Sequence, residues 1–247
     1  MRTKRTYLTL CILMLTLVLV GCNVIPGTGG GGSEDTSTVK PQYGTLTGIV
    51  TDSISGKKLW FGTVTMNGVT TKIKSGTFQI SDLPVGTHTL EASKTFYRNK
   101  HMQVTIKPGQ NVVEIPMNTI YSPTELDLFA RLINAEARGE IYRGQVAVAA
   151  SILNRVVHHN YPNTLTGVIK QRVGGVIQYS PVADGSINRP ARPNAKQAAW
   201  EALAGWDPSL GATGFFAPAK VRPGNWVWQQ IRIIDIGNHR FFRARID

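Results

Sequence analysis

Hydrophobic and polar residues follow two different periods along the chain. Between residues 43 and 117 they alternate, and turns of Gly, Pro, Asp and Asn separate the short runs. The clearest runs are Leu46-Thr47-Gly48-Ile49-Val50, Thr63-Val64-Thr65-Met66, Thr77-Phe78-Gln79-Ile80 and Val112-Val113-Glu114-Ile115. Several short strands at this spacing predict a small all-β sandwich over residues 44–119.

After Tyr121 the hydrophobic residues recur every three or four positions, as in an amphipathic helix. Ser122 is a predicted N-cap, with Pro123 at the first helical position and Glu125 two residues later. We expect this helix to end near Ala137. Two further helices are expected at Arg143 to His158 and Ala195 to Ala204, and two strands at Ile231 to Ile236 and Phe241 to Phe242. Residues 120–247 therefore form a mainly helical α+β domain in this interpretation.

The first 21 residues predict an export signal. Three basic residues precede an apolar run from Tyr7 to Gly21, which is shorter than the ~20 residues that a spanning helix needs. The run ends in Leu19-Val20-Gly21-Cys22, which resembles the lipobox of bacterial lipoproteins. That resemblance implies an acylated Cys22, a membrane anchor, and a mature chain on the outer face of the cell membrane facing the wall. A simple signal with a chance cysteine is the alternative, and residues 22–43 predict a flexible Gly/Ser-rich linker.

Cysteine content and charge restrict the chemistry. The only other cysteine is Cys11, inside the predicted signal, so the mature chain lacks a disulfide, a thiolate metal site and a Cys nucleophile. No histidines stand at metal-ligand spacing, and the glycines at 27–32 lack the flanks of a phosphate loop, so we expect no metal, no cofactor and no nucleotide chemistry. A formal net charge of +12 favours anionic envelope polymers or lipid head groups over nucleic acid as partners, unless it serves only solubility.

Glu136 is the strongest candidate for acid chemistry. It follows Leu132 by four residues and Ile133 by three, so the helix places it on or beside its apolar face. Burial disfavours the carboxylate, raises the pKa and keeps a proton donor available near neutral pH. The alternative is a glutamate that pairs with Arg138 or Arg143 or reaches solvent.

Several motifs stand in order around this residue. They are Asn134-Ala135-Glu136-Ala137-Arg138-Gly139-Glu140, Gly144-Gln145-Val146-Ala147, Leu153-Asn154-Arg155-Val156, Gln178-Tyr179-Ser180-Pro181, Gly205-Trp206-Asp207-Pro208 and Ile236-Gly237-Asn238-His239. Together they cover residues 122–243 and resemble the SleB-like cell-wall hydrolases, the family of the spore cortex-lytic enzymes. The resemblance implies a lysozyme- or transglycosylase-like domain that cleaves peptidoglycan between N-acetylmuramic acid and N-acetylglucosamine, with Glu136 as the catalytic acid.

The choice of mechanism depends on a second carboxylate, because glycosidases normally use two. Glu140 is the nearest, but Gly139 intervenes, and we expect Glu140 to anchor a loop by a hydrogen bond. Asp184 stands in a turn sequence, and we expect it to form that turn. A lone Glu136 resembles the glutamate of lytic transglycosylases, which use the muramyl 6-hydroxyl in place of water and leave a 1,6-anhydro end.

The family resemblance also implies substrate-binding residues. Gln178, Tyr179 and Ser180 match a segment that lines the glycan groove, and His239 matches less securely; ordinary loop bonding or a structural role is the alternative for each. The family's tyrosine-rich segment is replaced here by Thr213-Gly214-Phe215-Phe216-Ala217-Pro218, so either Phe216 keeps only the packing part of its role or the subsites are altered. Trp226 and Trp228 predict either a stacking ledge or a buried strand face.

Gly48-x-Val50-x-Asp52 and Gly76-x-Phe78-x-Ile80-x-Asp82-Leu83-Pro84-x-Gly86 resemble the carboxypeptidase regulatory-like, transthyretin-like family. That resemblance implies a fold rather than an activity. The complete interpretation is a lipoprotein with a β-sandwich spacer and a glycan-cleaving domain. The alternatives are a non-catalytic wall-binding or scaffolding lipoprotein on the same fold and a plain muramidase-type hydrolase.

Overall fold

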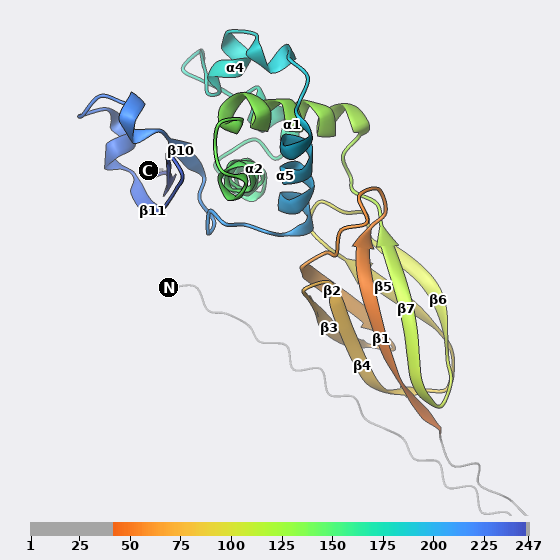
Figure 1. Cartoon of the computed structure of the whole chain (residues 1–247). Helices are drawn as coiled ribbons and strands as arrows, with labels where there is room; N and C mark the ends of the chain where they lie inside the picture. Colours follow the sequence, from red (N-terminus) through yellow and green to blue (C-terminus); the bar gives the residue numbers. More distant parts are fainter. Residues whose placement is uncertain (1–41, 246–247) are drawn as a thin grey trace, which may run out of the picture. The chain divides into compact units, whose positions relative to one another are not determined.

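The computed structural model describes residues 42–245 (Figure 1). The predicted export signal, Cys22 and all but the end of the predicted linker lie outside the described residues. No helix within 42–245 has the length and apolar character that crossing a membrane requires.

Seven strands form the amino-terminal part of the described chain. Their bounds are β1 Tyr43–Asp52, β2 Phe61–Met66, β3 Val69–Lys74, β4 Thr77–Pro84, β5 Gly86–Ser93, β6 Lys100–Ile106 and β7 Gly109–Met117. The four runs found in the sequence fall in β1, β2, β4 and β7, which confirms a β structure here.

The strands are hydrogen-bonded in the order β6-β5-β2-β3-β4-β1-β7. The single paired position between β3 and β4 is Lys74 with Thr77, so this pair is little more than a tight hairpin that connects two groups of strands. Both groups bury alternate residues in one apolar core, which includes Leu46, Val64 and Leu90. Within the second group β1 and β7 run parallel, paired from Gly44 with Gly109 to Asp52 with Met117.

The connection between β7 and the first helix is held by hydrogen bonds to the seven-stranded part. The Thr119 hydroxyl and the Ile120 backbone N–H both donate to the carbonyl of Phe96, at 2.9 and 3.0 Å. The Trp60 N–H donates to the carbonyl of Ala204 at 2.8 Å, and the Lys57 ammonium lies 2.7 Å from the Glu201 carboxylate.

Three long helices dominate the remaining residues: α1 Pro123–Ala137, α2 Tyr142–Val157 and α5 Pro193–Ala204. The Ser122 side chain accepts a hydrogen bond from the Glu125 N–H, while Glu125 accepts from the Ser122 N–H, so the predicted capping box is confirmed. Gly205 ends α5 with a left-handed φ of 117°. All three predicted helices are confirmed within two residues at each end.

α2 lies at the centre of the helical part, and ten consecutive residues from Gly144 to Leu153 are buried. Short elements that the sequence pattern did not predict surround it: α3 Leu165–Ile169, β8 Arg172–Val173, β9 Val176–Ile177, α4 Ser180–Ala183, η1 Ser186–Asn188, η2 Pro218–Lys220 and η3 Trp226–Gln229. A three-stranded sheet of β10 Gly214–Phe216, β12 His239–Arg243 and β11 Ile231–Ile236 completes the domain. The described structure thus has a β part followed by a mainly helical α+β part, while the transthyretin-like assignment stays a prediction.

Candidate active site

Glu136 lies in the last turn of α1, beside a cavity of 410 Å³. The cavity is formed where the end of α1 and the α1–α2 loop meet η2 and the β11–β12 turn. Its lining residues are Ala135, Glu136, Arg138, Gly139, Glu140, Ala217, Ala219, Lys220, Asn238 and His239. Of the predicted site residues, the structure brings Glu136 and His239 together in this cavity.

The setting of Glu136 favours its protonated form. Burial raises the pKa of the Glu136 carboxyl from 4.5 to about 7, the Arg155 guanidinium opposes that rise, and the Asp184 carboxylate adds to it. A carboxylic acid with this pKa holds a proton near neutral pH and delivers it to a bound oxygen. A large fraction of Glu136 is therefore protonated near neutral pH, as a general acid requires.

Tyr179 and Arg155 lie close to Glu136 but do not line the cavity. The Arg155 guanidinium lies between two rings, 5.1 Å from the centre of Tyr161 and 5.2 Å from that of Tyr179, and donates to the carbonyl of Thr213. Tyr179 is buried, and its hydroxyl has no hydrogen-bond partner in the described structure. Burial raises the pKa of Tyr179 to about 12, and the Glu136 charge contributes to that rise, so the hydroxyl stays protonated near the acid.

Glu140 fixes the β11–β12 turn. Its carboxylate accepts hydrogen bonds from the Asn238 N–H at 2.8 Å and the Asn238 side-chain amide at 3.2 Å. The expected loop anchor is thus confirmed, and Gly237 makes it possible, because a Cβ there would lie 2.4 Å from the Glu140 Oε2. Gly237 also has a φ of 59°, in the left-handed region.

Gly237→Ala is expected to lower the free energy of unfolding by about 2 kcal/mol, since it adds backbone strain and displaces the Glu140 carboxylate from Asn238. Gly174→Ala is the matched control, because Gly174 has a φ of 56° and nothing within 4 Å of an added Cβ. Thermal unfolding of both variants separates the two effects. Equal losses of stability would show that the Glu140 contact contributes nothing.

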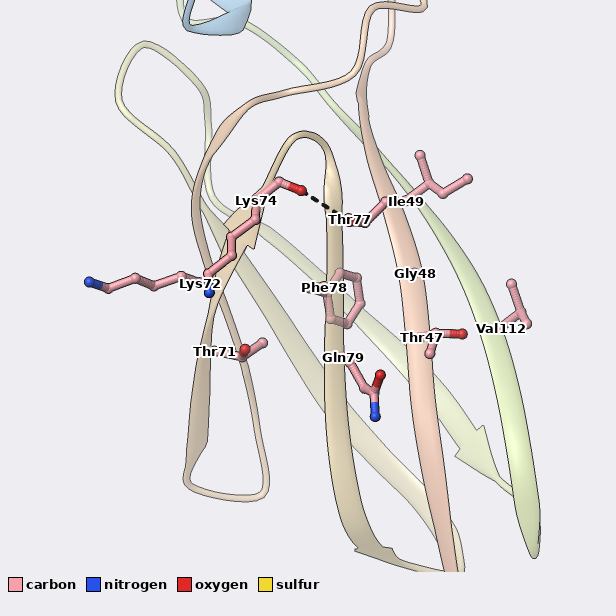
Figure 2. A pocket seen from close by; sticks show the side chains of 10 residues that line it. All are labelled: Thr47, Gly48, Ile49, Thr71, Lys72, Lys74, Thr77, Phe78, Gln79 and Val112. Atoms are coloured by element: carbon pink, nitrogen blue, oxygen red, sulfur yellow. Dashed lines mark hydrogen bonds between the residues drawn. The ribbon is translucent and has the colours of Figure 1, made fainter.

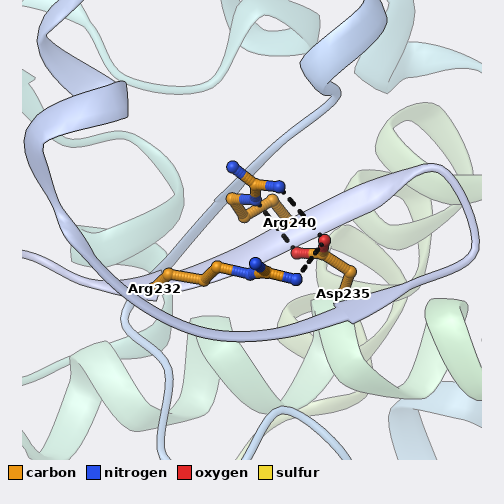
Figure 3. Close-up of polar contacts among 3 residues, drawn as sticks. All are labelled: Arg232, Asp235 and Arg240. Carbon is orange, nitrogen blue, oxygen red and sulfur yellow. Dashed lines mark hydrogen bonds and ion pairs between the residues drawn. The ribbon is translucent and has the colours of Figure 1, made fainter.

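Charged residues on β11 and β12 hold the two strands together beyond that turn (Figure 3). The Asp235 carboxylate accepts hydrogen bonds from Arg240 at 3.0 and 3.2 Å and from Arg232 at 2.8 Å. Such exposed pairs contribute about 0–1 kcal/mol each. The Asp235–Arg240 pair joins the two strands, whereas Arg232 and Asp235 both lie on β11.

Asp184 forms a turn, as expected from its sequence context. Its carboxylate accepts the Ser186 N–H at 2.8 Å, and this hydrogen bonding lowers the Asp184 pKa. The residue is exposed and stays charged. Its charge nevertheless influences Glu136, an effect that the turn sequence did not indicate.

His239 lies at the cavity wall with its ring against Phe215, 5.2 Å between ring centres. Burial lowers the His239 pKa below 6.5, Glu140 opposes that shift, and Lys220 adds to it. A neutral imidazole results at neutral pH. Its Nδ1 has no hydrogen-bond partner within residues 42–245.

The other predicted contacts lie outside this cavity. Phe216 is buried with its ring against Trp228 and Phe242, so it packs the small sheet. Gln178 and Ser180 are exposed, and the Gln178 amide donates to the carbonyl of Val176 at 3.2 Å. Ser180 begins α4.

The alternating tryptophans of η3 are neither a strand nor buried. Trp226 is 57% exposed and Trp228 37% exposed. The prediction of a buried strand face was therefore wrong, because the Asn225 side chain caps a 3₁₀ turn by accepting the Val227 N–H. The two exposed tryptophan rings pack on buried rings of the small sheet, Trp228 on Phe216 and Trp226 on Phe242.

A larger cavity, of 580 Å³, lies on the β-sandwich (Figure 2). Lys72 and Lys74 are its only titratable lining residues, so it has no acid to pair with a base. Within residues 42–245 no cluster of three or more His, Cys, Asp or Glu residues is arranged to hold a metal ion. The cavity at Glu136 is the better candidate for chemistry.

Several residues that line the site could not be identified from the sequence. Ala217, Ala219, Lys220 and Asn238 line the cavity from segments that lie far along the chain from Glu136. Arg155 stands in the motif Leu153-Asn154-Arg155, but nothing in a helical pattern distinguishes an arginine beside an acid from one in solvent. Asn154 instead binds the 207–212 loop, donating to Asp207 and to the carbonyl of Ala212 at 3.0 Å each.

The carboxy-terminal part of the chain is similar to known proteins. Residues 139–242 match the Cell Wall Hydrolase family. The chain is 40% identical over 136 residues to a spore cortex-lytic enzyme of Bacillus cereus, covering 55% of this chain and 50% of that protein. For the spore cortex-lytic enzyme of Bacillus subtilis the identity is 38% over 132 residues, covering 53% and 42%. The chain spans about half the length of the curated relatives it matches.

Among solved structures, the chain is similar to the catalytic domain of the germination-specific lytic transglycosylase SleB from Bacillus anthracis. The identity is 40%, and the match covers 50% of this chain and 98% of that domain, with a TM-score of 0.46. The catalytic domain of the Bacillus cereus SleB protein is 39% identical, with a TM-score of 0.45 and coverage of 50% and 92%.

Proposed function

Because the carboxy-terminal part of this chain is a SleB-like cell wall hydrolase domain, we propose that the protein cleaves peptidoglycan glycan strands between N-acetylmuramic acid and N-acetylglucosamine. The observation that carries the proposal is the partly buried carboxyl of Glu136, with a pKa raised to about 7, at the wall of a cavity. Glu136 acts as a single general acid and base in a lytic transglycosylase reaction.

The reaction needs one proton donor that later accepts a proton. Glu136 protonates the glycosidic oxygen as the bond from that oxygen to the muramyl C1 breaks, and positive charge develops at C1. The Glu136 carboxylate then takes the proton from the muramyl 6-hydroxyl as its oxygen bonds to C1. The products are a 1,6-anhydromuramyl end and a free N-acetylglucosamine hydroxyl, with no water consumed and Glu136 protonated again.

The contacts of the two nearby carboxylates support a single-acid mechanism. Glu140 is engaged by Asn238, and Asp184 by Ser186. Both carboxylates thus already hold the backbone of a turn in place, and this structural use favours Glu136 acting alone. Asp184 assists indirectly, because its charge raises the pKa of Glu136.

Substrate contacts follow from the same geometry. Of the predicted binding residues, His239 lines the cavity and is proposed to contact the glycan, whereas Tyr179 is buried beside Glu136 and is proposed to support the acid. The exposed amide of Gln178 and the hydroxyl of Ser180 contribute at the rim, and Phe216 supports the small sheet instead of contacting sugar.

The chain organisation proposed from the sequence completes this function. An acylated Cys22 holds the chain at the outer face of the membrane, residues 22–43 act as a tether, and residues 44–119 form a transthyretin-like spacer. The domain of residues 120–247 then acts on the wall.

A plain hydrolase and a non-catalytic scaffold are the alternatives. Phe215, Phe216 and Ala217 favour the scaffold, since they replace polar residues expected from the family, although Ala217 still lines the cavity. The proton-donating state of Glu136 favours catalysis.

Digestion of purified peptidoglycan with this protein is expected to yield 1,6-anhydromuramyl ends, which mass spectrometry distinguishes from reducing ends by the mass of one water molecule. Reducing ends would support the hydrolase. Soluble fragments no more abundant than those from a Glu136→Gln preparation would exclude both enzymes.

A further inference from the structure

A smaller cavity, of 220 Å³, adjoins the one at Glu136. Its lining residues are Asn134, Arg138, Gln145, Arg192, Pro193 and Asn194. Arg138 lines both cavities. Gln145 connects them too, because its side-chain amide donates to the backbone carbonyl of Glu140 at 3.1 Å. We call this smaller cavity the arginine cavity.

The arginine cavity is cationic. Arg138 and Arg192 are exposed, and neither guanidinium forms an ion pair or a side-chain hydrogen bond within residues 42–245. None of the lining residues is acidic. Glu136 and Glu140, each two residues from Arg138, both line the neighbouring cavity, and Glu140 is engaged there by Asn238.

Two backbone and side-chain features add hydrogen-bond donors. Arg192 is the N-cap of the twelve-residue helix α5. Pro193 has no N–H and the Ala195 N–H donates to the carbonyl of Arg192 at 3.1 Å, so the Asn194 N–H is the donor that this helix start adds beside the cavity. Asn134 is only 5% exposed, and its side-chain oxygen accepts the Arg192 N–H at 3.3 Å. Its side-chain amide nitrogen is a further donor at the wall of the cavity, which Asn134 lines.

These features match a carboxylate. Two guanidinium groups, a buried amide and a helix start favour an anion with several acceptor oxygens. The volume is below the ~300 Å³ typical of small-molecule sites, so the cavity fits one ionised group better than a sugar ring. An extended peptide advances ~3.3 Å per residue, so a few residues reach from one cavity to the next.

We propose that the arginine cavity binds a carboxylate of the stem peptide carried by N-acetylmuramic acid, while the glycan occupies the cavity at Glu136. The inference rests on the proposed function. It makes Arg192 and Asn134 determinants of specificity for peptide-bearing strands. Arg138 lies at the junction, where the peptide passes from the sugar to its site.

Arg192→Gln tests the inference, and Arg143→Gln is the matched control, because Arg143 is exposed and lines neither cavity. The substrates are peptidoglycan freed of phosphate polymers and the same strands after enzymatic removal of the stem peptides. We expect Arg192→Gln to lower the ratio of kcat/KM for peptide-bearing to peptide-free strands about tenfold. Arg143→Gln should leave the ratio unchanged.

A binding measurement keeps this test separate from catalysis. In the full-length chain with Glu136→Gln, titration with a muramyl tetrapeptide should give a Kd about tenfold weaker when Arg192→Gln is added. Equal Kd values with and without that change would overturn the inference, as would an equal loss on peptide-free strands. Competition by inorganic phosphate with no preference for the peptide would likewise identify a general anion site. Persistent cleavage by Glu136→Gln would refute only the proposed function.

Discussion

Glu136→Gln is expected to lower peptidoglycan cleavage by about 10²–10⁴-fold, which is the range that general acid and base catalysis contributes. Glutamine keeps the shape and polarity of the side chain but has no proton to give to the glycosidic oxygen. Release of soluble fragments from purified peptidoglycan, followed over hours, measures a loss of this size.

Glu140→Gln is the matched control, because it makes the same chemical change four residues later in the same cavity. Its amide oxygen still accepts the Asn238 N–H, so we expect a loss of about tenfold at most. A loss as large as that of Glu136→Gln would indicate a catalytic pair and contradict the single-acid mechanism.

The kcat/KM of the wild-type protein is expected to fall above pH 7, by about tenfold for each further pH unit. The catalytic form of Glu136 is protonated, and its pKa is raised to about 7, so the active fraction is high below that pH and shrinks above it. A profile of kcat/KM from pH 5 to 9 reports the pKa of the free protein. A midpoint near the ordinary value of 4.5 would show that burial does not perturb the acid.

Asp184→Asn supplies the control for this profile. The Asp184 charge raises the pKa of Glu136, so its removal should move the midpoint to lower pH without abolishing activity. An unchanged midpoint would remove Asp184 from the electrostatics of the site.

The same raised pKa affects folding, and its sign is opposite to that of a carboxylate in an ion pair. Native protein retains the Glu136 proton while unfolded protein loses it, so the free energy of unfolding falls as pH rises from about 4.5 to about 7. Glu136→Gln lacks this dependence and should be at least as stable as the wild type at pH 8. Thermal unfolding of the variant at that pH therefore also shows that its loss of activity is not a loss of structure.

The helices could be predicted because their signals are local. The Ser122 and Glu125 capping box, the three- and four-residue spacing in α1 and the glycine after α5 each act within a few residues. Strand β11 was predicted with its observed bounds for the same reason: its run of β-branched residues is bounded by Gly237.

The short elements could not be predicted because distant residues stabilise them. Strand β10 is three residues long and exists through its pairing with β12, where a Cβ on Gly214 would lie 2.3 Å from the Phe242 ring. No pattern within three residues encodes such a contact. The 3₁₀ turn at Trp226 was missed since alternation alone also fits a strand.

The same distinction between local signals and distant contacts applies to the residues of the site. Glu136 was predicted from its position on an apolar helix face together with the family resemblance of the motifs around it, and the anchoring role of Glu140 from the glycine that separates them. Arg155, Lys220 and Asn238 were missed, because their proximity to Glu136 depends on how α2, η2 and the β11–β12 turn assemble.

The parallel pairing of β1 and β7 determines how the seven-stranded part would respond to tension. The chain enters the sandwich at the start of β1 and leaves it at the end of β7, and these strands are paired along their whole common length. Tension between the two ends loads that ladder in shear, so its hydrogen bonds resist together instead of opening one after another. A domain pulled from its amino-terminal side while the catalytic domain grips a glycan strand would therefore bear the load without unravelling.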